Sequence, residues 1–228
     1  MTKNFTYTDV QHAYQENVSA QKIYLETLDS NDSETLKLAY NHFKWTALKT
    51  NLIVNENNFK IPYNALPNKF SMQSYNWLLP EKKNIFEKYY KYNPATNYFV
   101  INTKKSSIPY DDFNLLMHSL VLTRKAVVWV EFGVNIGAEF GGRHPAIILK
   151  NLDDSFIVLP LSSQEPSNDK FSVKINSVHG FPTLTRWANV TRIREIDISR
   201  IDFSHTIGNV NSTIMKNISD KMHSCGII

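Results

Sequence analysis

The sequence has 228 residues, 42% of them hydrophobic and 12% aromatic, which is enough to bury a core in one or two domains. Its formal net charge of +4 is too small to indicate a nucleic-acid partner by itself, and no apolar run approaches the roughly 20 residues that span a bilayer. The single cysteine, Cys225, excludes an intrachain disulfide, and the N-terminus lacks the apolar segment of a signal peptide. We therefore expect a soluble cytoplasmic protein with no membrane contact.

The first half of the chain carries mainly helical patterns. One helix is expected after a cap at Thr8 or Asp9, and a second after a capping box formed by Asn31 and Glu34. Residues 51–76 are rich in asparagine and include prolines, which indicates loops. The expected helices cover residues 9–28, 31–47, 81–92 and 109–122, and the expected short strands cover residues 59–61 and 97–101.

Residues 82–92 mix lysines with aromatic side chains, as surfaces that bind single-stranded nucleic acids do. Helical spacing gives a simpler explanation, because it places Phe86, Tyr89 and Tyr90 on one face of a helix and leaves the lysines in solvent. We favour the amphipathic helix over the binding surface.

The most informative stretch is residues 125–150, KAVVWVEFGVNIGAEFGGRHPAIILK. Four of the seven glycines lie between positions 133 and 142, and the apolar runs on either side are β-branched and aromatic. This pattern predicts two strands joined by a functional loop. Glu139, Arg143 and His144 make this loop the densest cluster of ionisable groups beside glycine in the sequence.

The second half of the chain predicts an antiparallel, barrel-like sheet followed by a helix. The expected strands cover residues 126–132, 145–150, 155–161, 171–175 and 187–190, and the expected helix covers residues 210–223. We therefore predict an α+β fold, with a mostly helical domain over residues 1–122 and a β-barrel domain over residues 123–228. No flexible linker separates them, so we expect the two halves to pack closely.

Five pieces of the second half, taken in order, resemble the MazF/PemK family of toxin ribonucleases. These pieces are VVWVEFG, NIGAEFGGRHP, AIIL, LSSQ and IREIDISRI, and together they cover roughly residues 124–228. The resemblance implies a small SH3-like barrel of the MazF/CcdB type, a homodimer and an antitoxin protein as partner. It also implies cleavage of single-stranded RNA, such as mRNA, to 2′,3′-cyclic phosphate and 5′-hydroxyl ends, without a metal or cofactor.

The family has an arginine directly before the proline that follows the loop, and that arginine is taken as catalytic. Here His144 precedes Pro145, and Arg143 lies one position earlier. Neighbouring residues of an extended chain point to opposite sides, and a residue before proline is held extended, so His144 inherits the direction of the family arginine. We expect His144 to act as acid or base and Arg143 to contact phosphate.

The family's second catalytic position, a threonine or serine after the third strand, corresponds to Ser162. Its hydroxyl is expected to donate to the scissile phosphate, and Glu139 is expected to position substrate or accept the 2′ proton. The remaining expected substrate contacts are Asn135, Phe140, Ser163 and Gln164. No spacing of histidines or cysteine indicates a metal site.

A function of another class remains open. Related barrels act by contacting a protein such as a topoisomerase, and a chain that has replaced its loop arginine could be such a binding module. The role of the first 122 residues is equally open, between a built-in inhibitor, an adaptor and a dimerisation arm. Near the end of the chain, Arg194 and Arg200 are expected to pair with Asp197 or Asp202.

Overall fold

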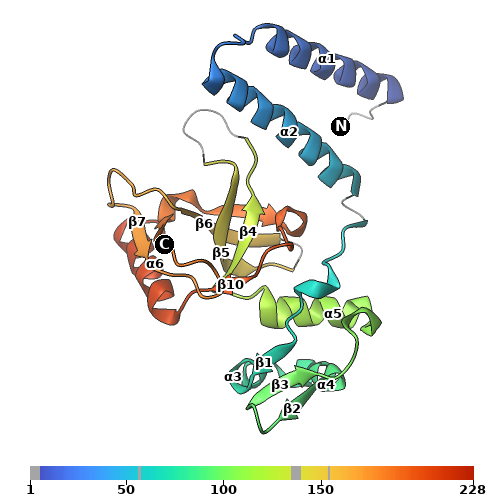
Figure 1. The fold of residues 1–228 in the computed structure, drawn as a ribbon, viewed down its shortest axis with the longest axis vertical. Coiled ribbons are helices and arrows are strands. Elements are labelled where there is room, and N and C mark those ends of the chain that lie inside the picture. The colour runs from blue at the N-terminus through green and yellow to red at the C-terminus, as the bar shows by residue number, and fades with distance from the viewer. Residues whose placement is uncertain (1–5, 56–57, 135–139, 154) are drawn as a thin grey trace. The chain divides into compact units, whose positions relative to one another are not determined.

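The computed structural model describes residues 6–55, 58–134, 140–153 and 155–228 (Figure 1). The chain divides into two compact units, Met1–Val54 and Asn55–Ile228, which are taken in turn below. None of the described helices is long and apolar enough to cross a membrane.

The first unit is a pair of helices, α1 (Tyr7–Glu26) and α2 (Ser33–Asn55). Thr6, not Thr8 or Asp9, caps α1, because its side chain accepts from the Asp9 amide while the Asp9 carboxylate bonds back to Thr6. The expected Asn31 capping box is also wrong, since the Asp32 carboxylate accepts the first amides of α2. No glycine or proline follows before Asn55, so α2 runs past its expected end.

The second unit begins with a small α/β segment. Its sheet has the order β1-β3-β2, with both pairings antiparallel. The elements are β1 (Lys69–Ser71), α3 (Met72–Asn76), α4 (Pro80–Tyr89), β2 (Tyr90–Asn93), β3 (Tyr98–Ile101) and α5 (Tyr110–Leu116), with 3-10 turns at Tyr63–Ala65 and Lys105–Ser107 and a π-helical turn at Met117–Val121.

Two expectations for this segment need correction. The strand expected at residues 59–61 is absent there, and the paired strand lies instead at β1. The helix expected over residues 81–92 ends at Tyr89, where the chain turns into β2. The rings of Phe86 on α4 and Tyr90 on β2 are buried and stack with centroids 4.7 Å apart, so these two aromatic residues belong to the core, although Tyr90 lies on a strand and not on the expected helix.

The rest of the second unit is a curled antiparallel sheet with a C-terminal helix, as expected. The strand order is β10-β4-β5-β6-β8-β7, and β9 pairs with β6. The elements are β4 (Ala126–Glu131), β5 (Arg143–Asn151), β6 (Ser155–Ser162), β7 (Ser172–Ile175), β8 (Arg186–Asn189), β9 (Arg194–Asp197), β10 (Gly208–Asn209) and α6 (Ser212–Ser224).

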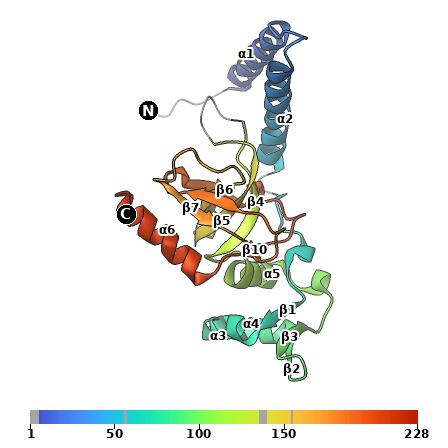
Figure 2. The same ribbon diagram turned by 60° about the vertical axis from the view of Figure 1, so that its left-hand side comes forward.

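The two faces of this sheet belong to different hydrophobic cores. Along β5, Ala146 and Ile148 enter a first core that also holds Phe113 and Leu116 of α5. Ile147 between them enters a second core, where α6 covers the other face of the sheet (Figure 2). The first core therefore combines residues as far apart in the sequence as Ile61 and Phe203. The compact units divide at Val54, and a domain boundary at residue 123 stays a prediction.

Candidate active site

Arg143 and His144 lie on opposite faces of the sheet. In the β4–β5 ladder Glu131 pairs with Arg143 and Val130 pairs with His144. Directly opposed residues in an antiparallel pair share a face, and successive residues alternate. The side chains around Arg143 and those around His144 accordingly form separate groups. The structure does not bring these two residues into one site.

The imidazole of His144 is half-buried and lies against Phe140, with ring centroids 4.4 Å apart. Burial lowers the pKa of His144 below its usual 6.5 because the charged form is poorly solvated. The backbone of Leu161 and Gly141 acts in the opposite direction, and the positive charge of Arg192 lowers the pKa further. At neutral pH the ring is therefore uncharged and able to accept a proton.

Ser162 lies on the same face as His144. The β5–β6 ladder pairs Ala146 with Pro160, so continuing this register by two residues places Ser162 opposite His144. The Ser162 oxygen accepts a hydrogen bond of 3.0 Å from the Gln164 amide. This bond uses one lone pair and leaves the hydroxyl proton available to donate. Ser163 and Gln164 are exposed in the turn that follows.

Arg192 is a member of this group that the sequence analysis missed. It is exposed at the end of the 3-10 turn after β8, and its guanidinium lies 5.3 Å from the centre of the Phe140 ring. Phe140 itself is 9% exposed and packs edge-on against Phe132, so it forms a fixed base under both Arg192 and His144. An exposed cation thus lies over the same aromatic ring as His144, and the Ser162 hydroxyl lies across the strands from His144.

Arg143 lies in a different cluster on the other face. Its guanidinium bonds to the Asp202 carboxylate, lies 3.8 Å from Oε1 of Glu131 and 2.7 Å from Nδ1 of His205, and covers the Trp129 ring at 5.4 Å. Asp202, expected to pair with Arg194 or Arg200, is therefore a partner of Arg143. Two carboxylates offset the charge of one guanidinium, which leaves little positive potential for a phosphate.

Two of the expected site residues, Glu139 and Asn135, lie outside the described residues. Within the described ranges, no three His, Cys, Asp or Glu side chains converge in a way that could hold a metal ion.

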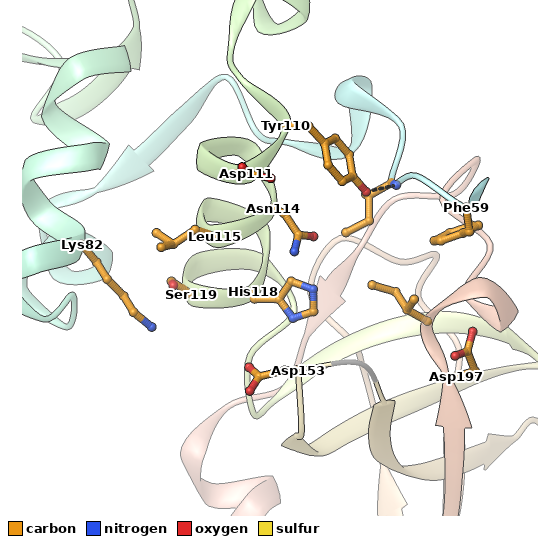
Figure 3. Close-up of a pocket in the computed structure, with 12 residues that line it drawn as sticks. Phe59, Lys82, Tyr110, Asp111, Asn114, Leu115, His118, Ser119, Asp153 and Asp197 are labelled. Carbon is orange, nitrogen blue, oxygen red and sulfur yellow. Dashed lines mark hydrogen bonds between the residues drawn. The ribbon is translucent and has the colours of Figure 1, made fainter. Parts of the chain in front are cut away.

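A cavity of about 790 Å³ elsewhere in the second unit contains none of the expected site residues. Asn114 and His118 point into it from α5 and the turn that follows, with Lys82, Asp153 and Asp197 around it (Figure 3). His118 stacks on Phe156 and contacts Asn151, so part of its ring is held by the first core.

The C-terminal part of the chain matches a known family. Residues 123–225 match the family model of the PemK-like, MazF-like toxin of type II toxin-antitoxin systems. These residues form a PemK/MazF-type domain. The residues before them match nothing in the same comparisons, and no curated protein matches the chain.

Solved structures similar to the PemK/MazF-type domain include MazF (form I) from Deinococcus radiodurans, with 19% identity and a TM-score of 0.39 over 47% of this chain and 98% of that one. The Mycobacterium tuberculosis toxin MazF-mt6 has 11% identity and a TM-score of 0.35 over 46% and 98%. The MazE–MazF complex (form II) from D. radiodurans has 20% identity and a TM-score of 0.35 over 45% and 93%.

Proposed function

We propose that this protein is a toxin that cleaves single-stranded RNA without a metal ion and leaves 2′,3′-cyclic phosphate and 5′-hydroxyl ends. The proposal is supported by the group of His144, Ser162 and Arg192 around Phe140 in a PemK/MazF-type domain. These side chains provide a proton acceptor, a hydrogen-bond donor and a fixed cation, which are the parts that the reaction needs.

In the proposed reaction His144 removes the proton of the ribose 2′-hydroxyl, and the 2′-oxygen attacks the adjacent phosphorus. The P–O5′ bond breaks as the 2′,3′-cyclic phosphate forms, and the proton held by His144 passes to the departing 5′-oxygen. Ser162 donates to a phosphate oxygen, and Arg192 stabilises the charge that develops there. No oxidation or reduction takes place, and the proton taken from the 2′-oxygen ends on the 5′-oxygen.

Arg143 has another role in this proposal. Because it already bonds Asp202 and lies near Glu131 and His205, it ties the start of β5 to the segment after β9. It thereby fixes the backbone from which His144 projects. The proposed substrate contacts include Ser163 and Gln164, which are exposed beside Ser162. They also include the face of the Phe140 ring, Asn135 and Glu139.

We also propose that an antitoxin protein inhibits this toxin and that the domain forms a homodimer. The match to a toxin of type II toxin-antitoxin systems supports the first, because such systems pair a toxin with an antitoxin. The solved MazE–MazF complex from D. radiodurans is an assembly of that kind.

The purified full chain, incubated with a long single-stranded RNA in EDTA, tests the proposed function. We expect discrete cuts with 5′-hydroxyl ends in the wild type and in His223→Ala, a control histidine that is exposed on α6. His144→Ala is expected to lose the cuts. Absence of cuts in the wild type would contradict the ribonuclease and favour a binding module that acts on a protein partner such as a topoisomerase.

A further inference from the structure

A row of side chains extends from the proposed active site across the sheet. Ser162 of β6 pairs with Trp187 of β8, and Trp187 pairs with Lys174 of β7. Opposed residues share a face, so these side chains lie on the face that carries His144. The sequence neighbours Leu161 and Ala188 are fully buried in the second core, on the opposite face of the sheet, as this alternation requires.

Trp187 and Lys174 form the outer end of this row. The indole is only partly buried, although tryptophan is a large apolar side chain. The Lys174 ammonium is 5.4 Å from the centre of the indole ring. Lys174 is exposed and takes part in none of the ion pairs among the described residues, so its charge is not offset as that of Arg143 is.

An indole beside an ammonium group matches the chemistry of a single-stranded nucleotide. Bases of any identity stack on an aromatic face, and a lysine contacts the phosphate next to the base. Strands in a sheet are about 4.8 Å apart, so the Trp187 side chain, two strands from β5, is roughly 10 Å from His144. That separation fits a nucleotide beside the cut and not the nucleotide that is cut.

We infer that Trp187 and Lys174 form a subsite for a nucleotide flanking the scissile phosphate. The base stacks on Trp187 and its phosphate contacts Lys174. This inference rests on the proposed function for its orientation relative to the cut, but binding at the subsite is measurable without any cutting. The Arg192–Phe140 pair at the other end of the row then holds the scissile phosphate near His144.

The test is the affinity of the full chain for a fluorescein-labelled single-stranded RNA of mixed sequence, measured by anisotropy in the His144→Ala background so that the probe stays intact. Trp187→Leu is expected to weaken binding roughly ten- to hundredfold, whereas Trp187→Phe keeps a stacking face and loses much less. Lys174→Gln is expected to lower the slope of log affinity against log salt by about one.

Lys170→Gln is the matched control, because Lys170 is an exposed lysine beside an aromatic ring, 5.2 Å from Phe171, in the segment that enters β7. It is expected to bind as the parent does. Thermal melting of each variant verifies that it is folded. Wild-type affinity in a folded Trp187→Leu variant would overturn the inference, and so would a parent protein that does not bind the probe.

The two proposals fail in different ways. If RNA binds and depends on Trp187 while the wild type never cuts, the ribonuclease proposal fails and the subsite stands. If the wild type cuts and Trp187→Leu both binds and cuts at the wild-type rate, the subsite fails and the ribonuclease stands. In an active enzyme, Trp187→Leu is further expected to weaken the preference for the base beside the cut.

Discussion

His144 and Arg143 are neighbours in the sequence but lie in different surroundings. His144 lies on an apolar base formed by Phe140, with a cation nearby, and these surroundings keep its ring neutral. Arg143 lies between carboxylates, which fix its position and offset its charge. In the proposed reaction, the histidine before the proline is the proton acceptor at the position where the family has an arginine, and Arg192 is the cation.

Arg192→Gln is expected to raise the pKa of His144, because it removes a positive charge that disfavours the imidazolium. NMR titration of the His144 ring measures this pKa directly, with Arg194→Gln on β9 as the matched control. An unchanged titration in Arg192→Gln would contradict this account.

The lowered pKa of His144 also makes the stability of the fold depend on pH. The imidazole of His144 binds a proton near pH 6.5 in the unfolded chain and only at lower pH in the folded chain. The free energy of unfolding is therefore highest above that pH and falls as the pH drops below it.

For these two residues, the sequence predicted the sides of the strand to which the side chains point, but not the residues that they contact. The alternation of side chains in an extended strand correctly predicted that Arg143 and His144 point to opposite sides. The partners Asp202 and Arg192 lie far along the chain. Asp202 is brought close by the backbone bond of its amide to Trp129 on β4, and Arg192 by the turn after β8. Two arginines occur in the stretch from Arg192 to Arg194, and nothing in the local sequence distinguishes the one that lies over Phe140.

Among the elements, the short strand β10 holds the edge of the sheet through an unusually close approach of two backbones. Gly208 pairs with Val127 of β4, and its neighbour Asn209 exchanges backbone hydrogen bonds of 2.9 and 3.0 Å with His179. A Cβ atom at position 208 would lie 2.5 Å from the carbonyl oxygen of His179 and 2.7 Å from the Phe181 ring. Only glycine allows this approach without movement of the backbone.

Gly208→Ala is therefore expected to lower the free energy of unfolding by about 1–3 kcal/mol, as overpacking does. Chemical denaturation measures the change, and Asn209→Ala, at an exposed neighbouring position, is the control with little expected effect. An unchanged denaturation midpoint in Gly208→Ala would show that the two segments separate at no cost.

The longer strands were predictable from their runs of β-branched residues, which need no tertiary information. β9 and β10 were not, because β9 has the sequence REID and β10 has only two residues, so neither shows the alternation of a half-buried strand. The α4–β2 junction escaped for the opposite reason. Its aromatic residues fit a helix by spacing, while pairing with β3 draws Tyr90–Asn93 into a strand.

For the whole molecule, the shared first core determines which fragments can fold. Phe113, Leu116 and Met117 are fully buried in it beside residues of β4, β5 and β6. The first unit, in contrast, buries only Ala39 among the described residues of its helices. Composition predicted one or two domains but could not show that residues 61–122 complete the core of the sheet, because that depends on which faces meet.

Deletion of residues 1–54 is expected to leave a folded protein, whereas deletion of residues 1–122 is expected to prevent folding. Loss of a large buried side chain costs about 2–5 kcal/mol, and losing several exceeds the roughly 5–15 kcal/mol by which domains are stable. Circular dichroism melting of both fragments measures the difference. A cooperative transition at the full-length temperature in the fragment starting at Thr123 would contradict the shared core and would support a boundary at residue 123.

In the proposed reaction, His144 transfers the proton and Arg143 does not. The most direct measurement is the initial rate of RNA cleavage in EDTA for the wild type, His144→Ala and Arg143→Ala, each verified as folded. We predict a loss of about a hundredfold or more for His144→Ala. For Arg143→Ala we predict substantial remaining activity, with a loss of about 1 kcal/mol in stability from its partly exposed ion pairs. An active His144→Ala beside an inactive, folded Arg143→Ala would contradict the account.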